Sequence, residues 1–354
     1  MNAVPAGLGR SALEAAAESR PMSPAPANAK PDAGSTARKD AVAEGFSGLL
    51  VVDKPAGVTS HDAVVQVRRR LRSPGAGHLG TLDPGASGLL LVALGAATRA
   101  IPVWQAGDKT YEGTAVFGVT TTTQDLEGQV LERRPVELDE AEVRDAARSF
   151  VGDIEQVPPM VSALKVGGER LHRLARRGIT VERLPRRVTV VSWEWLSFEL
   201  PEASFRVRCA GGTYVRTLVH DLGRAVGTGA ALKRLRRLRS EPFGLERSVS
   251  LRDLGDLAPE AVLDRAGIAL DDALGVLPSV ALDPDAALKV GTGGRPTVSL
   301  GSTPLLQGPR SVVLRDLGGR ALALAELRPH PTDPALALAC PRVVFPWAVQ
   351  AGRS

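Results

Sequence analysis

The residues best suited to chemistry lie in a glycine-rich segment, Gly77-His-Leu-Gly-Thr-Leu-Asp-Pro-Gly85. Asp83 precedes a proline and a glycine, a combination that favours a tight turn in which the carboxylate accepts a backbone hydrogen bond. The segment also leads into a strongly apolar run, and loops beside rigid elements commonly carry functional groups. Taken alone, Asp-Pro-Gly is more often a structural turn than a catalytic carboxylate.

A series of motifs in one order changes that interpretation. The motifs are Lys54-Pro-x-Gly-x-Thr-Ser60, Gly77-His-x-Gly-Thr-Leu-Asp-Pro-x-Ala-Ser-Gly88, Lys109-x-Tyr111, Thr121-x-Thr-x-Asp-x-x-Gly128, Ser162-Ala-Leu-Lys-x-x-Gly168, Cys209-x-x-Gly-Thr-Tyr-x-Arg216 and Leu235-Arg-Arg-x-x-Ser240. Each has an ordinary structural explanation, but none of these explains the ordered series. The series closely resembles the TruB family of tRNA pseudouridine synthases, from about residue 48 to about residue 250.

The resemblance assigns the central roles to three residues. Asp83 matches the catalytic aspartate, and Arg216 matches the arginine that pairs with it. Tyr111 matches a tyrosine that stacks on the target base and is a candidate for proton transfer. Alone, Tyr111 would be a packing residue of a strand. We assign no chemistry to the Thr121–Gly128 motif, which predicts a turn and cap.

Three more residues acquire substrate-binding roles in the same way. Tyr214 matches a second active-site tyrosine, His78 a histidine that contacts the opened T-loop, and Leu235 an apolar residue of the base pocket. Without the resemblance, His78 would be a polar loop residue and Leu235 a core residue. Lys54 could organise the active-site loop or close a turn.

These residue types suit the reaction that the resemblance implies, the conversion of uridine 55 of tRNA to pseudouridine. The C1′–N1 bond breaks, the uracil turns, and C5 joins C1′. The sugar becomes positive as the bond breaks, so a carboxylate serves as nucleophile or charge stabiliser. An adjacent arginine keeps that carboxylate ionised and oriented. The target base must leave its stack by base flipping, and the reaction needs no cofactor.

Positive charge is concentrated in two short segments, although the net charge of the chain is only +5. Residues 165–187 and 224–239 each have a net charge of +6, whereas residues 240–274 total −5. Such clustering suggests a phosphate-rich partner, or two solvated helix faces. By resemblance, 165–187 is an RNA-binding insertion over the tRNA elbow, and 224–239 lines the approach to the active site.

Together with the predicted helices and strands, the resemblance implies an α+β pseudouridine synthase fold with a mixed, largely antiparallel sheet and flanking helices. The predicted regions are a disordered extension (1–46), a catalytic domain (47–275) and a small β-rich, PUA-like domain (278–350). Predicted helices include one capped by Ser60, one over 168–177, one over 214–226 and a basic one over 230–239. Residues 187–199 and 203–210 are expected to pair as strands.

The remaining composition favours a soluble protein of a reduced compartment, which we expect to be the cytoplasm, and we expect the protein to be a monomer. No apolar run approaches the length that spans a bilayer. Cys209 and Cys340 are too few for a disulfide framework or a common zinc site, so we expect no metal. No obligate protein partner is expected. Two alternatives stay open: a guide-RNA-dependent synthase that works in a ribonucleoprotein, and an RNA-folding chaperone with incidental catalytic residues.

Overall fold

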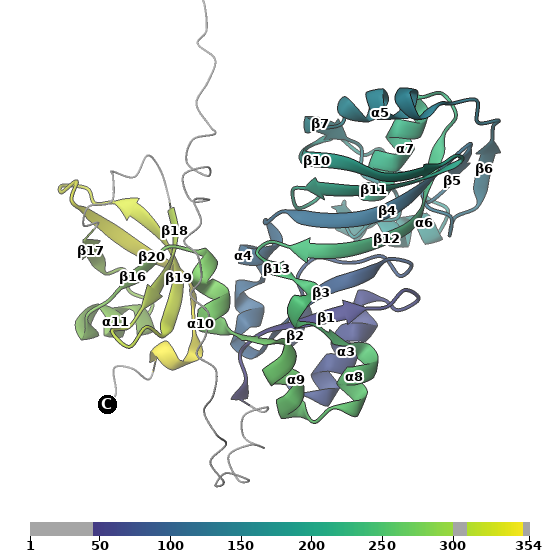
Figure 1. Cartoon of the computed structure of the whole chain (residues 1–354). Helices are drawn as coiled ribbons and strands as arrows, with labels where there is room; N and C mark the ends of the chain where they lie inside the picture. Colours follow the sequence, from purple (N-terminus) through teal and green to yellow (C-terminus); the bar gives the residue numbers. More distant parts are fainter. Residues whose placement is uncertain (1–44, 300–309, 350–354) are drawn as a thin grey trace, which may run out of the picture. The chain divides into compact units, whose positions relative to one another are not determined.

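The computed structural model describes residues 45–299 and 310–349, whose strands form two main sheets (Figure 1). The extension predicted over residues 1–46 lies outside the described residues apart from its last two. Of the helices in the described ranges, none is long and apolar enough to cross a bilayer.

The larger sheet is mixed and mostly antiparallel, as predicted. Only the pairs β1–β14 and β3–β12 run parallel among its described strands. In spatial order its main strands are β14 (Val249–Ser250), β1 (Gly48–Lys54), β3 (Ser87–Leu94), β12 (Ala230–Ser240), β4 (Lys109–Phe117), β11 (Glu202–Cys209), β10 (Arg186–Glu199) and β7 (Gly152–Gln156). Short strands β2 (Ala76–His78), β13 (Phe243–Gly244) and β15 (Gly267–Ala269) pair with β3, β12 and β1.

Helices cover this sheet in two groups, each over its own apolar cluster. Near β1 and β3 lie α3 (Ser60–Arg70), α8 (Leu251–Asp256) and α9 (Pro259–Ala266). Near β10 and β11 lie α5 (Glu140–Arg148) and α7 (Val215–Ala225) (Figure 1). The short α4 (Ile101–Gln105) follows β3. The strand pair predicted over 187–199 and 203–210 is confirmed by β10 and β11.

The N-cap of helix α3 lies one residue before the predicted cap, Ser60. The side chain of Thr59, not that of Ser60, accepts a hydrogen bond from the Asp62 backbone, and the Asp62 side chain completes a capping box. The Ser60 hydroxyl is buried and bonds to a loop 22 residues further on instead. A long-range contact therefore decides which of the two hydroxyls caps the helix.

The basic helix predicted over 230–239 is wrong, because these residues form β12 between β3 and β4. Alanine, leucine, lysine and arginine are strong helix formers, so local propensity pointed to a helix. The strand is stabilised instead by pairing on both sides and by ion pairs of its arginines. Arg236 bonds to both carboxylate oxygens of Asp53 on β1, and Arg239 pairs with Glu241. Tertiary context overrides propensity here.

The insertion 165–187 begins as a small hairpin rather than a helix. Strands β8 (Lys165–Val166) and β9 (Glu169–Arg170) pair across two glycines with positive φ, Gly167 and Gly168. The helix α6 (Leu171–Arg176) is therefore shorter than the predicted 168–177. A second small hairpin, β5 (Val119–Thr121) and β6 (Val130–Arg133), encloses the Thr121–Gly128 motif.

The last described part of the chain forms a second sheet, confirming the predicted β-rich region. Its spatial order is β16 (Ser279–Ala281), β18 (Arg310–Arg315), β19 (Ala321–Pro329), β20 (Leu336–Val344) and β17 (Thr297–Ser299). Helix α11 (Pro284–Gly291) packs its buried residues Ala287 and Val290 into the core of this sheet. The short α10 (Leu270–Ala273) precedes it in the chain.

Gly88 lets β3 and β12 approach each other beside the Asp83 loop. Its φ of +99° suits glycine, and a Cβ atom there would lie 2.2 Å from the backbone oxygen of Arg237. The parallel register pairs these same two residues. Any side chain at position 88 would therefore push β12 away from β3.

Gly88→Ala should lower the free energy of unfolding by about 3 kcal/mol or more, because backbone strain and steric overlap add. Urea unfolding measures the loss. Gly319→Ala is the matched control, since Gly319 also has a positive φ of +85° but a Cβ atom added there would meet nothing within 4 Å. Equal losses in the two variants would show that strain alone matters at Gly88.

Candidate active site

Asp83 lies in the loop between β2 and β3, and this loop is held on both sides of the carboxylate. Before Asp83, the Ser60 hydroxyl accepts a hydrogen bond from Leu82 N and donates one to Leu82 O, both at 2.9 Å. After it, the Gly57 amide donates to Pro84 O at 2.8 Å. The loop is thus fixed by the turn and helix that follow β1.

Lys54 reinforces the same turn from inside. Its side chain is fully buried, and the ammonium donates to the carbonyls of Pro55, Val58 and Pro84 at 2.8, 2.7 and 3.4 Å. Burial lowers the pKa of Lys54 to about 8, while the nearby Asp83 carboxylate acts in the opposite direction. Lys54 therefore both closes the turn and ties it to the Asp83 loop.

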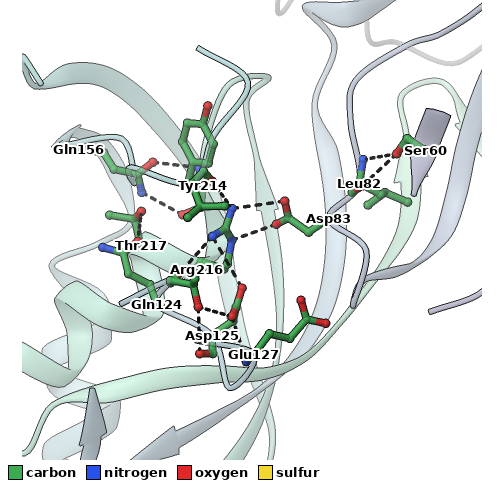
Figure 2. Close-up of polar contacts among 12 residues, drawn as sticks. Ser60, Leu82, Asp83, Gln124, Asp125, Glu127, Gln156, Tyr214, Arg216 and Thr217 are labelled. Carbon is green, nitrogen blue, oxygen red and sulfur yellow. Dashed lines mark hydrogen bonds and ion pairs between the residues drawn. The ribbon is translucent and has the colours of Figure 1, made fainter. Parts of the chain in front are cut away.

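Arg216, from the first turn of α7, bonds to both oxygens of Asp83 (Figure 2). The distances are 2.9 Å from Nε to Oδ2 and 3.3 Å from Nη2 to Oδ1. Two more hydrogen bonds reach the carbonyls of Thr123 and Val161, each at 2.8 Å. The guanidinium is buried, with 4% of the side chain exposed, so its orientation is set by these acceptors.

The Thr121–Gly128 motif forms the predicted turn, and it also supports Arg216. Asp125 Oδ2 lies 3.6 Å from Arg216 Nη1, and Asp125 Oδ1 accepts hydrogen bonds from the Thr123 hydroxyl and the Glu127 amide (Figure 2). The interpretation that assigned this motif no chemistry missed this connection. The guanidinium of Arg216 therefore has two carboxylate neighbours, Asp83 and Asp125.

A cavity of about 320 Å³ opens in front of this ion pair. Five of the six residues selected from the sequence line it: Asp83, Tyr111, Tyr214, Arg216 and Leu235. They come from the β2–β3 loop, from β4, from the start of α7 and from β12, so the fold assembles them from distant parts of the chain. The cavity has the size of a small-molecule site.

The comparisons with known proteins match the part of the chain that contains every residue lining the cavity. Residues 68–215 match the N-terminal domain of the TruB family pseudouridylate synthases, and residues 216–275 match the tRNA pseudouridylate synthase B C-terminal domain. The chain belongs to the TruB family. Its similarity to TruB relatives therefore extends well beyond the motifs around the cavity.

Curated TruB relatives named tRNA pseudouridine synthase B cover most of the chain. The protein of Syntrophotalea carbinolica is 42% identical over 80% of this chain and 93% of its own length. The protein of Geobacter sulfurreducens is 44% identical, with 79% and 93% covered. That of Burkholderia mallei is 48% identical, with 67% and 78% covered.

Solved structures confirm the pseudouridine synthase fold. A chain of a Cbf5-Nop10-Gar1 complex superposes with a TM-score of 0.64 at 28% identity, covering 84% of this chain and 85% of its own. A chain of an H/ACA RNP bound to a substrate RNA containing 2'-deoxyuridine gives 0.62 at 25% identity, with 84% of each covered.

His78 is the selected residue that does not line the cavity of this TruB protein. It lies on β2, and its Nδ1 is buried without a hydrogen-bond partner among the described residues. Burial lowers the pKa of His78, and the charges of Arg237, His61 and Arg170 lower it further. Because its ordinary pKa is already below 7, the imidazole is neutral at pH 7.

The two tyrosines keep their protons at neutral pH. Burial raises the pKa of Tyr111, although the charge of Arg237 and a hydrogen bond with it act in the opposite direction. Burial also raises the pKa of Tyr214, against a hydrogen bond with Ser162. Both phenols can therefore donate a hydrogen bond or a proton. Among the described residues, no group of three or more His, Cys, Asp or Glu side chains is placed to hold a metal ion.

Gln156, which the sequence interpretation missed, positions the start of α7. Its side-chain amide accepts from Tyr214 N at 2.8 Å and donates to Tyr214 O at 3.1 Å (Figure 2). Helix α7 has no side-chain N-cap, so this buried amide takes that place. Arg216 follows two residues later. No local pattern marks Gln156, because its partner is 58 residues away.

Gln156→Ala should slow the catalysed reaction by about 10- to 100-fold, because a small displacement of Tyr214 and Arg216 spoils the reacting geometry. Gln156→Glu, which keeps the acceptor but loses the donor, should fall between this variant and the wild type. Single-turnover rates and RNA affinity are measured separately.

The expected loss is in rate and not in affinity. Gln66→Ala, on the half-buried face of α3, is the control and should leave the rate unchanged. A Gln156→Ala enzyme that reacts at the wild-type rate would show that the two hydrogen bonds to Tyr214 do not position the site.

Proposed function

We propose that this protein converts uridine 55 in the T-loop of tRNA to pseudouridine, without a guide RNA and with Asp83 as the nucleophile. The observation that carries the proposal is the bidentate contact of the buried Arg216 with Asp83 at the wall of the cavity. The TruB relatives at 42–48% identity are named for action on tRNA, which supports this substrate.

The geometry suits each step of the isomerisation. Arg216 holds both oxygens of Asp83 at the wall of the cavity, where C1′ of the target nucleotide becomes positive as the C1′–N1 bond breaks. Tyr111 and Leu235 offer apolar walls for a base that has left its stack. The protonated phenol of Tyr111 is available for the proton transfer that ends the reaction.

The basic insertion 165–187 supports RNA as the partner, since phosphate contacts position an RNA while its shape and its flipped base provide selectivity. In this proposal, residues 47–275 form the catalytic domain and 278–350 a PUA-like domain. The protein acts as a monomer in the cytoplasm. The solved neighbours in complexes with partner proteins are only 25–28% identical, so a guide-dependent assembly is the second candidate.

The test uses purified protein and an unmodified tRNA transcript that carries tritium at uracil C5. The wild type should release tritium stoichiometrically from position 55 alone. Asp83→Asn should lower the rate by roughly 10⁴-fold or more, the scale expected when a nucleophile is removed. It should still bind tRNA, because the carboxylate contributes little to phosphate contacts.

Asp145→Asn is the matched control, because this carboxylate lies on α5 with 80% of its side chain exposed, and it should keep full activity. Tight tRNA binding by the wild type without tritium release would contradict the proposal. Activity that appears only with a guide RNA and partner proteins would favour the second candidate.

A further inference from the structure

Arg237 on β12 is a buried cation in the wall of the cavity, with 2% of the residue exposed. Its Nε donates to Leu89 O at 2.7 Å and its Nη2 to Gly80 O at 3.3 Å. The Tyr111 phenol is its other neighbour. These acceptors are neutral, so the charge of the guanidinium is not cancelled by them.

No ion pair is formed by Arg237 within the described ranges, in contrast to Arg216, Arg236 and Arg239. Arg236 pairs with Asp53 and Arg239 with Glu241, while Arg216 pairs with Asp83. Burying a charge without a counter-ion costs several kcal/mol. Such a cost is often found where the charge serves a functional site.

The positive charge of Arg237 affects the pKa values of groups in and near the cavity. After burial, it is the next cause that lowers the pKa of both His78 and Lys109, and it also opposes the raised pKa of Tyr111. Lys109 lines the cavity too, but its ammonium donates to the carbonyls of Gln105 and Gly107, and its pKa is lowered to about 8. Arg237 is therefore the cation with both permanent charge and donors to spare.

In the proposed reaction a negative charge develops on the uracil, and the Asp83–Arg216 pair does not stabilise that charge. When the C1′–N1 bond breaks heterolytically, its electron pair goes to N1, and the uracil carries a negative charge spread over its ring nitrogens and carbonyl oxygens. Arg216 already donates to Asp83 and to two backbone carbonyls. A group that stabilises this charge must lie in the same cavity as the base.

We infer that Arg237 is a catalytic residue that donates to a carbonyl oxygen of the target uracil and stabilises the negative charge formed during C1′–N1 cleavage. This inference rests on the proposed function. Asp83 bonds to C1′ as N1 leaves. C5 of the turned uracil then bonds to C1′ and displaces Asp83, the C5 proton is lost, and N1 gains a proton. Atoms and charge balance without a co-reactant.

The first test compares Arg237→Met with the wild type in single-turnover reactions on the tRNA transcript. The rate should fall by about 10²- to 10³-fold, the usual cost of removing one donor aimed at developing charge. The Kd for tRNA should change by less than about threefold, since a group that acts in the transition state adds little to ground-state binding. Arg206→Met is the control.

Arg206 suits this purpose because it lies on the opposite face of the same sheet. Tyr111 pairs with Val207 and Arg237, whereas Glu112 pairs with Arg206 and Arg236, and successive residues of a strand point to opposite faces. The ion pairs of Arg206 are with Glu112 and Glu194, on that opposite face. Arg206→Met should therefore react at the wild-type rate.

A second substrate separates charge stabilisation from a purely structural role. In a transcript with 5-fluorouridine at the target position, the fluorine makes the uracil a better leaving anion, so the reaction depends less on Arg237. The defect of Arg237→Met should be about tenfold smaller on this substrate, as Brønsted behaviour requires. Because no C5 proton is released, the rearranged nucleoside is quantified by nuclease digestion and mass spectrometry.

An Arg237→Met enzyme with the wild-type rate would overturn the inference, and so would an equal defect on both substrates. If this variant does not fold, as judged by its melting temperature, the same substrate comparison is made with Arg237→Lys and Arg237→Gln. The lysine variant should then exceed the glutamine variant, and equal rates would overturn the inference. A wild type inactive on tRNA would instead contradict the proposed function.

Discussion

The ion pair between Arg216 and Asp83 is the contact around which the rest of the catalytic sheet is arranged. A guanidinium with 4% exposure is costly to bury without a counter-ion, and Asp83, Thr123, Val161 and Asp125 supply the acceptors around Arg216. In return, the guanidinium holds both oxygens of the Asp83 carboxylate, which lies at the wall of the cavity. The pair is a positioning device as much as a charge pair.

Each side of this pair is held by a buried polar group from a distant segment. Ser60 fixes the backbone before Asp83, and Gln156 fixes the residue that starts α7. Gly88 allows β12 to pass close to the Asp83 loop, which places Arg237 on the cavity wall. Precision at the site thus depends on a few contacts between elements that are far apart in sequence.

The arginines on the two faces of the sheet have different partners. On the face away from the cavity, arginines and carboxylates alternate across the strands, so that Arg236 pairs with Asp53 and Arg206 with Glu112 and Glu194. On the cavity face, Arg237 has neutral acceptors instead. On β12, Arg236 is therefore paired with a carboxylate on one face, whereas Arg237 on the cavity face bonds to neutral acceptors, which a count of charges along the sequence does not reveal.

The candidate catalytic residues were easier to predict from the sequence than the residues that position them. Asp83, Tyr111 and Arg216 belong to motifs with a set order, and the structure brings them to one cavity. Gln156 escaped prediction because its hydrogen bonds join positions 58 residues apart. Arg237 escaped because it stands in a basic run whose composition favours an exposed helix, and only its position in a central strand makes it buried.

The fold was predictable to a similar degree. The hydrophobic pattern identified the paired strands β10 and β11, because the pattern of these segments is set by burial. The strand β12 was assigned to the wrong class, since helix propensity is local whereas strand pairing is not. The choice of Thr59 over Ser60 as the helix cap likewise depended on a contact outside the helix.

The most direct test of the central ion pair is the single-turnover rate of Arg216→Met, measured with saturating enzyme beside its Kd for tRNA and its melting temperature. If Arg216 holds Asp83 for reaction, the rate should fall by about 10³-fold, as for other losses of preorganised charge, while tRNA still binds. A correctly folded Arg216→Met enzyme that reacts within a few-fold of the wild type would contradict the account.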